Sequence, residues 1–194
     1  MTIHARMEKL TRKIGEQLHA IDRKSIEQFV ESIMNAKRIF IGGAGRSGLV
    51  AKAFGMRLMH LGFTVYVIGE VITPAISKGD LLIIVSGSGE TQSIVVAAGI
   101  AKKKGVKLVS ITSNPRSDIG KISDVVVQIK GRRPEDAKRD YEARQLAGKH
   151  EPLTPLGTLF ELSAIVFLDS IIDELMLRYK KSEDELKKLH ANLQ

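Results

Sequence analysis

The stretch Leu81-Leu-Ile-Ile-Val85, followed directly by Ser86-Gly-Ser-Gly-Glu-Thr91, decides the fold. Five consecutive apolar residues that end in a glycine-rich turn predict a strand buried on both faces of a sheet. An earlier stretch has the same order, with the apolar run Arg38–Ile41 ahead of the glycine-rich loop Gly42–Gly48. A helical pattern follows each loop, and strands that alternate with helices predict parallel strands joined by helical crossovers.

Short apolar runs predict five strands, at Arg38–Ile41, Phe63–Ile68, Leu81–Val85, Lys107–Ile111 and Val125–Ile129. Helices are expected between them, at Ser47–Leu61, Thr91–Lys104 and Ser117–Ile122. Together these elements predict an α/β fold, a single three-layer α/β/α domain with a five-stranded parallel sheet. We expect the flavodoxin-like strand order 2-1-3-4-5.

The whole chain, 1–194, is interpreted as one domain with helical flanks. Residues 1–36 have the spacing of two amphipathic helices, and 37–130 form the α/β core. Residues 131–155 are a long polar connection, with a short helix expected near 135–146. Residues 156–194 are C-terminal helices, the last of which is opened by a capping box at Ser182.

Composition excludes several classes of protein. The 194 residues contain no cysteine, so disulfides and thiolate metal sites are impossible, and no metal-ligand spacing stands out. The net charge of +8 could attract nucleic acid, but aromatic residues are only 5% and tryptophan is absent, which favours a small phosphorylated ligand. Without a membrane-length apolar run or a signal-peptide core, a cytoplasmic protein with no membrane partner is expected.

The first glycine-rich loop allows two interpretations. Gly43, Gly45 and Gly48 form the spacing of a dinucleotide-binding loop, and Glu70 follows the next strand at about the place of a ribose-binding acid. However, that interpretation gives the second loop no role. In an open parallel sheet with the expected order, both loops lie at the switch point where ligands bind.

The second loop has the chemistry of a phosphate site. Ser86, Ser88 and Thr91 supply hydroxyl donors, and Gly87 and Gly89 let the backbone approach a ligand closely. The helix that follows offers unpaired N–H groups at its N-terminus. A plain tight turn with a capping hydroxyl is the alternative, but it would not require three hydroxyl groups.

The stretch Leu159–Leu168 is apolar on all sides except for Glu161, which predicts a buried helix with one carboxylate in it. Burial raises the pKa of a carboxyl group and makes it suitable as a general base, unless it is paired structurally. Two histidines, His60 and His190, lie close to apolar residues. From spacing alone, either is more often structural than catalytic.

Taken together, these motifs resemble the sugar-isomerase (SIS) domain family. The resemblance rests on Gly43–Gly48, Met56–Gly62, Gly69–Pro74 and Ser86–Thr91. With Gly157–Glu161 and His190–Leu193 added, the chain is most similar to the 6-phospho-3-hexuloisomerases of that family. The resemblance covers the chain from about residue 37 onward.

The resemblance implies interconversion of D-arabino-hex-3-ulose 6-phosphate and D-fructose 6-phosphate without a cofactor or metal. It implies a tetramer whose sites are shared between subunits. The implied partner enzyme is the synthase that joins formaldehyde to ribulose 5-phosphate, and the implied pathway is the ribulose monophosphate pathway. Residues carried over to the phosphate site are Ser47, Ser86, Gly87, Ser88, Gly89 and Thr91. Catalytic candidates are Glu161 for carbon proton transfer, His190 with His60 in reserve for the oxygens, and Arg46 for enediolate charge. The alternatives are another SIS-type aldose–ketose phosphate isomerase and a non-catalytic sugar-phosphate-binding module.

Overall fold

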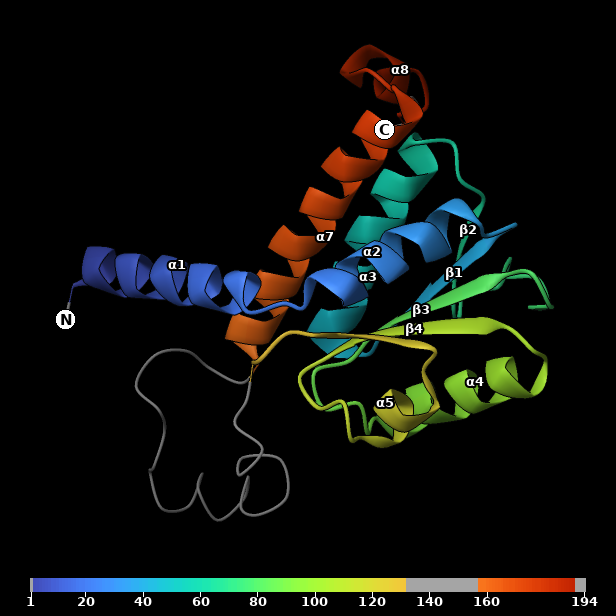
Figure 1. Ribbon diagram of the computed structural model, residues 1–194, viewed down its shortest axis with the longest axis horizontal. Coiled ribbons are helices and arrows are strands. Elements are labelled where there is room, and N and C mark those ends of the chain that lie inside the picture. Colours follow the sequence, from blue (N-terminus) through green and yellow to red (C-terminus); the bar gives the residue numbers. More distant parts are fainter. Residues whose placement is uncertain (1, 132–156, 191–194) are drawn as a thin grey trace.

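A computed structural model describes residues 2–131 and 157–190, so the helix expected near 135–146 lies outside the described part. The described strands form one parallel sheet in the order β2-β1-β3-β4-β5, which confirms the expected order (Figure 1). The strands are β1 (Ile39–Gly42), β2 (Val65–Val67), β3 (Leu81–Val85), β4 (Lys107–Thr112) and β5 (Val125–Gln128).

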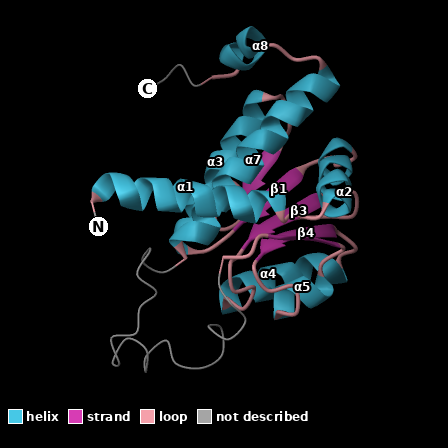
Figure 2. Cartoon of the chain, turned by 60° about the vertical axis from the view of Figure 1, so that its left-hand side comes forward, coloured by secondary structure: helices cyan, strands magenta, loops and turns pink. Residues whose placement is uncertain are grey.

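Helices cover both faces of the sheet, as expected for three layers (Figure 2). One face carries α2 (Arg23–Met34), α3 (Gly45–His60) and α7 (Thr158–Tyr179). The other carries α4 (Gln92–Lys103) and α5 (Asp118–Ile122). Side chains of β3 alternate between the two cores, because successive residues of a strand point to opposite faces. This explains why β3 is apolar throughout.

Two further helices flank the sheet and the helices that cover it. α1 (Ile3–His19) extends away from them and lies against α7 at one end only (Figures 1 and 2). None of its residues is buried, and Ile3 and Met7 are more than half exposed. α8 (Glu183–Lys188) follows α7, and it begins with the capping box expected at Ser182.

The expectation that the Leu159–Leu168 stretch is buried on all sides is only partly right. Phe160, Ala164 and Phe167 pack into the core, but Val166 is 41% exposed. The reason is geometric, since α7 lies on the outside of its layer and turns one face of every turn away from the sheet. Val166 is an apolar residue on that outward face, which also carries Asp169, Ser170 and Asp173.

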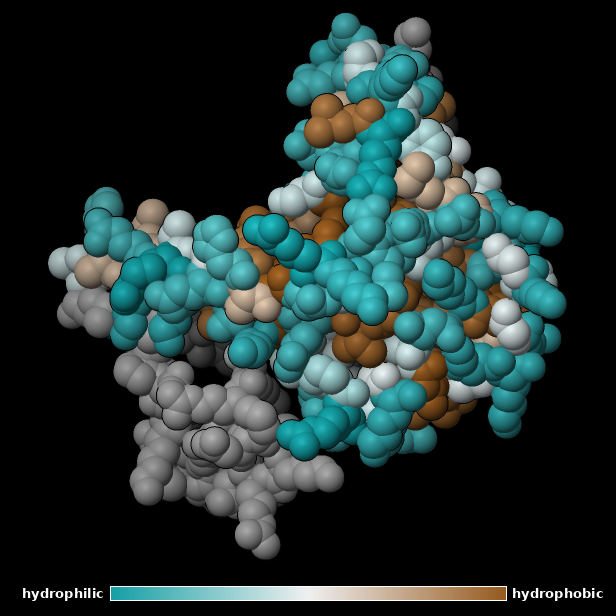
Figure 3. Space-filling model, in the orientation of Figure 1, coloured by the Kyte–Doolittle hydropathy of each residue, from teal (hydrophilic) through white to brown (hydrophobic). Residues whose placement is uncertain are grey.

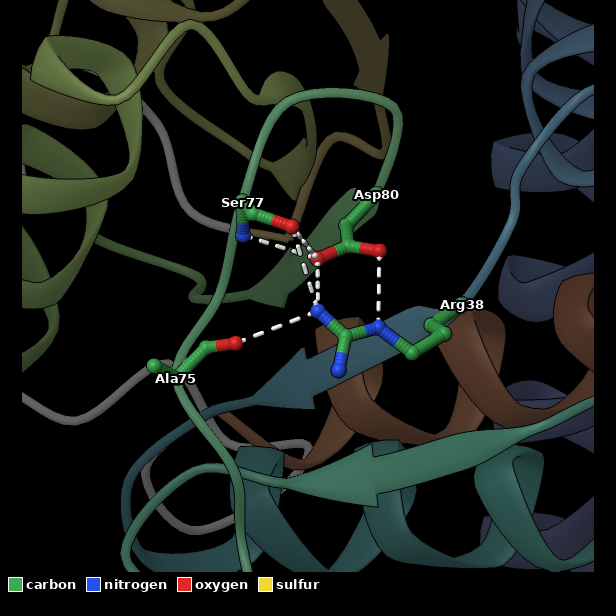
Figure 4. A network of polar contacts seen from close by, with 4 residues as sticks. All are labelled: Arg38, Ala75, Ser77 and Asp80. Atoms are coloured by element: carbon green, nitrogen blue, oxygen red, sulfur yellow. Dashed lines mark hydrogen bonds and ion pairs between the residues drawn. The ribbon is translucent and has the colours of Figure 1, made fainter.

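An ion pair fixes the register of the two central strands at their amino ends (Figure 4). Arg38, just before β1, donates two hydrogen bonds to Asp80, just before β3, at 2.9 and 2.6 Å. Ser77 N–H also donates to Asp80, at 2.8 Å, and Arg38 donates to the carbonyl of Ala75. The pair therefore holds the segment that returns from β2 and sets Ile39 opposite Leu81.

The Asp80 carboxylate stays charged despite its burial. Its side chain is 2% exposed. Burial alone would raise the pKa of Asp80, but the hydrogen bonds from Arg38 and Ser77 and the Arg38 charge outweigh that effect and lower it. A lowered pKa stabilises the fold above the pKa of the unfolded chain, and this contribution disappears as pH falls through the folded-state value.

We expect Asp80→Asn to lower the free energy of unfolding at pH 7 by about 3 kcal/mol, because it leaves the Arg38 guanidinium without its counter-charge. Urea titrations should show the gap between wild type and variant constant above about pH 4 and shrinking at lower pH. Glu16→Gln is the control, since the Arg12–Glu16 pair is 4.0 Å long and exposed. It should change stability by less than about 0.5 kcal/mol, and an equal loss in both variants would contradict the assignment.

Candidate active site

A cleft of about 200 Å³ opens at the carboxyl ends of the central strands. Its walls come from the loops after β1 and β3, the end of β4 and the start of α7. The lining residues are Ala44, Ser47, Ser86, Gly87, Ser88, Thr91, Ser113, Gly157, Phe160 and Glu161. The structure thus brings together five of the six residues expected to hold phosphate and the expected carboxylate.

The cleft exists because the chain leaves β1 and β3 on opposite sides of the sheet. α3 packs on one face and α4 on the other, so the two neighbouring loops diverge. Gly43 is needed where they touch, because a Cβ there would lie 2.7 Å from the carbonyl oxygen of Val85. A Cβ on Gly48 would lie 2.8 Å from the Gly43 carbonyl oxygen. These two glycines of the first loop thus permit close packing without a dinucleotide.

In the second loop, two serine hydroxyl oxygens accept hydrogen bonds from backbone N–H groups. Ser86 Oγ accepts a hydrogen bond from Gly89 N–H at 3.1 Å, and Ser88 Oγ accepts one from Glu90 N–H at 3.3 Å. A hydroxyl that accepts in this way keeps its own proton for a ligand oxygen. Gly89 does not line the cleft. It adopts φ +67, and a Cβ there would collide with Ser117 Oγ, so its role is to shape the loop.

Glu161 projects from the first turn of α7, with its side chain 12% exposed. Arg46 Nε, from the first turn of α3, lies 2.6 Å from Glu161 Oε2, and the Arg46 side chain is 57% exposed. The carboxylate expected to be alone in apolar surroundings therefore has a charged partner on its solvent side. This contact joins two catalytic candidates, Arg46 and Glu161, at the edge of the cleft.

Sequence reasoning missed four lining residues, Ala44, Ser113, Gly157 and Phe160. Ser113 directly follows β4, the neighbour of β3, so the rule that ligands bind beyond the carboxyl ends of strands could have found it. Gly157 begins the motif Gly157–Glu161 on which the resemblance rests, but nothing in the sequence assigned it a role in the cleft. It begins α7 with φ +74, and a Cβ there would lie 3.2 Å from Glu161 Oε1.

His60 and His190 lie outside this first cleft. Their rings are 5.0 Å apart in a second cleft of about 450 Å³ between α3, α7 and α8. Arg46 and His60 are at opposite ends of α3, roughly 20 Å apart at 1.5 Å per residue. Burial lowers the pKa of His60, and the neighbouring His190 and Arg57 lower it further, so His60 is neutral near pH 7. Neither histidine reaches the first cleft of its own chain.

Glu70, the acid that a dinucleotide interpretation would assign to a ribose, forms an ion pair with Lys52 at 2.7 Å. It does not line the cleft. Within residues 2–131 and 157–190, no helix has both the length and the apolar character needed to cross a bilayer.

Comparisons with known proteins agree with this geometry. Residues 32–139 match the SIS domain family. An uncharacterized protein of Aeropyrum pernix is 46% identical, over 97% of this chain and 91% of its own. The 3-hexulose-6-phosphate isomerase of Bacillus subtilis is 39% identical, over 90% and 89%.

Among solved structures, a protein of Methanococcus jannaschii, for which a molecular function of 3-hexulose-6-phosphate isomerase was inferred, superposes with a TM-score of 0.78. It is 33% identical, and the match covers 97% of this chain and 98% of that one. The chain therefore belongs to the SIS domain family and, within it, groups with the 3-hexulose-6-phosphate isomerases.

Proposed function

We propose that this protein interconverts D-arabino-hex-3-ulose 6-phosphate and D-fructose 6-phosphate. The observation that carries the proposal is one cleft that contains both a loop of hydroxyl donors and a mostly buried, ion-paired carboxylate. A donor loop alone would suit any phosphorylated ligand, whereas the carboxylate adds proton-transfer chemistry. The named relatives narrow the substrate to a 3-hexulose 6-phosphate.

The phosphate is assigned to the second loop. The hydroxyls of Ser86 and Ser88 keep their protons for phosphate oxygens, and Ser47 and Thr91 add donors from the starts of α3 and α4. Thr91 is the N-cap of α4 and its side chain makes no capping bond. The positive end of the α4 dipole adds attraction for an anion.

Glu161 is assigned the proton transfer between carbons. Moving the carbonyl from C3 to C2 requires that a proton leave C2 and return at C3 through a cis-enediolate. One carboxylate can take and return that proton, provided the intermediate stays in place. Arg46, 2.6 Å from Glu161, brings positive charge close to where the enediolate forms and stabilises it.

The hexulose needs no ring-opening step. With the carbonyl at C3, attack by O5 or O1 would close a four-membered ring, and O6 carries the phosphate. The substrate is therefore open-chain, so the second acid-base group is needed for proton transfer between the two oxygens. We assign this role to His190, with His60 in reserve.

Because His190 lies in the second cleft, it would have to act in a neighbouring subunit. Apolar surface left uncovered in one chain supports such an assembly. Ile3 and Met7 on α1, Leu49 on α3 and Val166 on α7 are all more than 40% exposed. Figure 3 shows apolar surface where α1 meets the body. We propose a homo-tetramer with shared sites in the cytoplasm, supplied by a 3-hexulose-6-phosphate synthase.

The direct test is an assay in which such a synthase makes the hexulose from formaldehyde and ribulose 5-phosphate. We expect fructose 6-phosphate to form only when this protein is added. An aldose–ketose phosphate isomerase would instead leave the hexulose unchanged and consume an aldose phosphate supplied in its place. A non-catalytic module would bind fructose 6-phosphate with no turnover of either sugar, and that outcome would overturn the proposal.

Glu161→Gln should lower kcat by at least about 100-fold, because the amide cannot accept the C2 proton. Glu70→Gln is the matched control, since it also removes an ion-paired carboxylate but lies outside the cleft. Its kcat should stay within about twofold of wild type. Near-normal turnover of Glu161→Gln would exclude Glu161 from the reaction.

Ser88→Ala should raise KM by about tenfold with little change in kcat, because it removes one hydrogen bond to a charged group that is made equally before and during the reaction. Inorganic phosphate should compete with the sugar in the wild type and less strongly in the variant. Ser170→Ala, which removes a hydroxyl bonded to the Val166 carbonyl on α7, serves as the control. If phosphate does not compete with the sugar in the wild type, the loop assignment is wrong.

A further inference from the structure

The Gly87 carbonyl in the second loop accepts an unusual number of hydrogen bonds. Ser113 N–H donates to it at 3.1 Å, Ser113 Oγ at 2.6 Å and Thr112 Oγ1 at 3.3 Å. A carbonyl oxygen has two lone pairs, so these three donors saturate it. All three come from the end of β4, which pairs with β3.

This arrangement determines where the next N–H points. A peptide group is planar and trans, so the Ser88 N–H points opposite to the Gly87 carbonyl. The carbonyl is held toward β4, and β3 lies between β4 and β1 in the sheet. The Ser88 N–H therefore points toward the loop after β1, whose residues Ala44 and Ser47 form the opposite wall of the cleft.

The position of Gly87 is restricted from its other side as well. A Cβ there would lie 3.1 Å from the Phe160 ring, so the loop is packed between the end of β4 and the start of α7. Phe160 directly precedes Glu161. The phosphate loop is thus held in place by packing on two sides.

Ser113 itself is unsuited to hold the phosphate. Its only hydroxyl proton is donated to Gly87, so the oxygen offers lone pairs alone to the cleft that it lines. Lone pairs repel a phosphate oxygen. Its backbone is held in turn by Gln128 Nε2, which donates to the Ser113 carbonyl at 3.3 Å.

We infer that Ser113 is a positioning residue, which orients the Gly87–Ser88 peptide so that its N–H faces the ligand's phosphate group. The inference rests on the proposed function only for the identity of the ligand. A group that acts through the loop should affect binding of any phosphate, including inorganic phosphate, and should leave the proton-transfer step unchanged.

The test compares Ser113→Ala, Ser113→Thr and wild type by KM, kcat and the inhibition constant of inorganic phosphate. We expect Ser113→Ala to raise KM and the phosphate constant by the same factor, about 3- to 12-fold, which corresponds to one neutral hydrogen bond. Its kcat should stay within about twofold. Ser113→Thr keeps the hydroxyl and should restore both constants.

Ser123→Ala is the control, because Ser123 Oγ also donates to a backbone carbonyl, that of Ile119 at 2.8 Å, away from the cleft. It should leave both constants unchanged. Ser113→Cys, with a weaker donor of similar size, gives the same test if the alanine variant does not fold, and it should shift both constants in the same direction.

Unchanged phosphate inhibition in Ser113→Ala, or a fall in kcat alone, would overturn the positioning role. These outcomes are separate from failure of the proposed function, in which the wild type itself would not isomerise the hexulose. Phosphate binding to an inactive wild type can still be measured by calorimetry, so Ser113 can be tested in either case.

Discussion

The parallel pairing of β1 with β3 is the constraint on which the site depends. The two strands are bonded from Ile39 opposite Leu81 to Gly42 opposite Ile84, so their following loops emerge side by side. The helices after them cover opposite faces of the sheet, and the loops separate above the strands. A single register shift would move one loop by about 3.3 Å and separate the donors that share the cleft.

Most of the fold could be predicted from the sequence because its signals are local. β3 has the predicted bounds, Leu81–Val85, and the other strands differ from prediction by one or two residues at their ends. The capping box at Ser182 begins α8 as expected. The apolar stripe of α1 was also recognisable. Its lack of burial was not, since helical spacing indicates an apolar face but not what covers it.

The site, too, could be predicted only in its local parts. Glycine and hydroxyl residues in one short loop indicated a phosphate cradle, and a lone acid in an apolar helix indicated Glu161. The Arg46–Glu161 contact joins residues 115 positions apart, and no local pattern specifies such a pair. Ser113 was missed because one serine at the end of a strand is common. The placement of His60 and His190 in another cleft depends on how α8 folds back onto α3.

The glycines of the first loop show how one motif can serve two purposes. Their spacing matches a dinucleotide-binding loop, yet the contacts of Gly43 and Gly48 are with protein backbone. Close approach of two loops requires the absence of a side chain as strictly as close approach of a pyrophosphate does. The spacing alone therefore cannot distinguish the two cases, whereas a second loop with hydroxyl donors can.

The cleft takes its walls from elements that lead into both helical layers, Ser47 at the start of α3 and Thr91 at the start of α4. An anion bound between them links the two layers, which otherwise have separate cores. A ligand there would have to leave before either layer opened, so occupancy would raise the free energy of opening in both. A ligand held this way would therefore slow amide hydrogen exchange in both helical layers together.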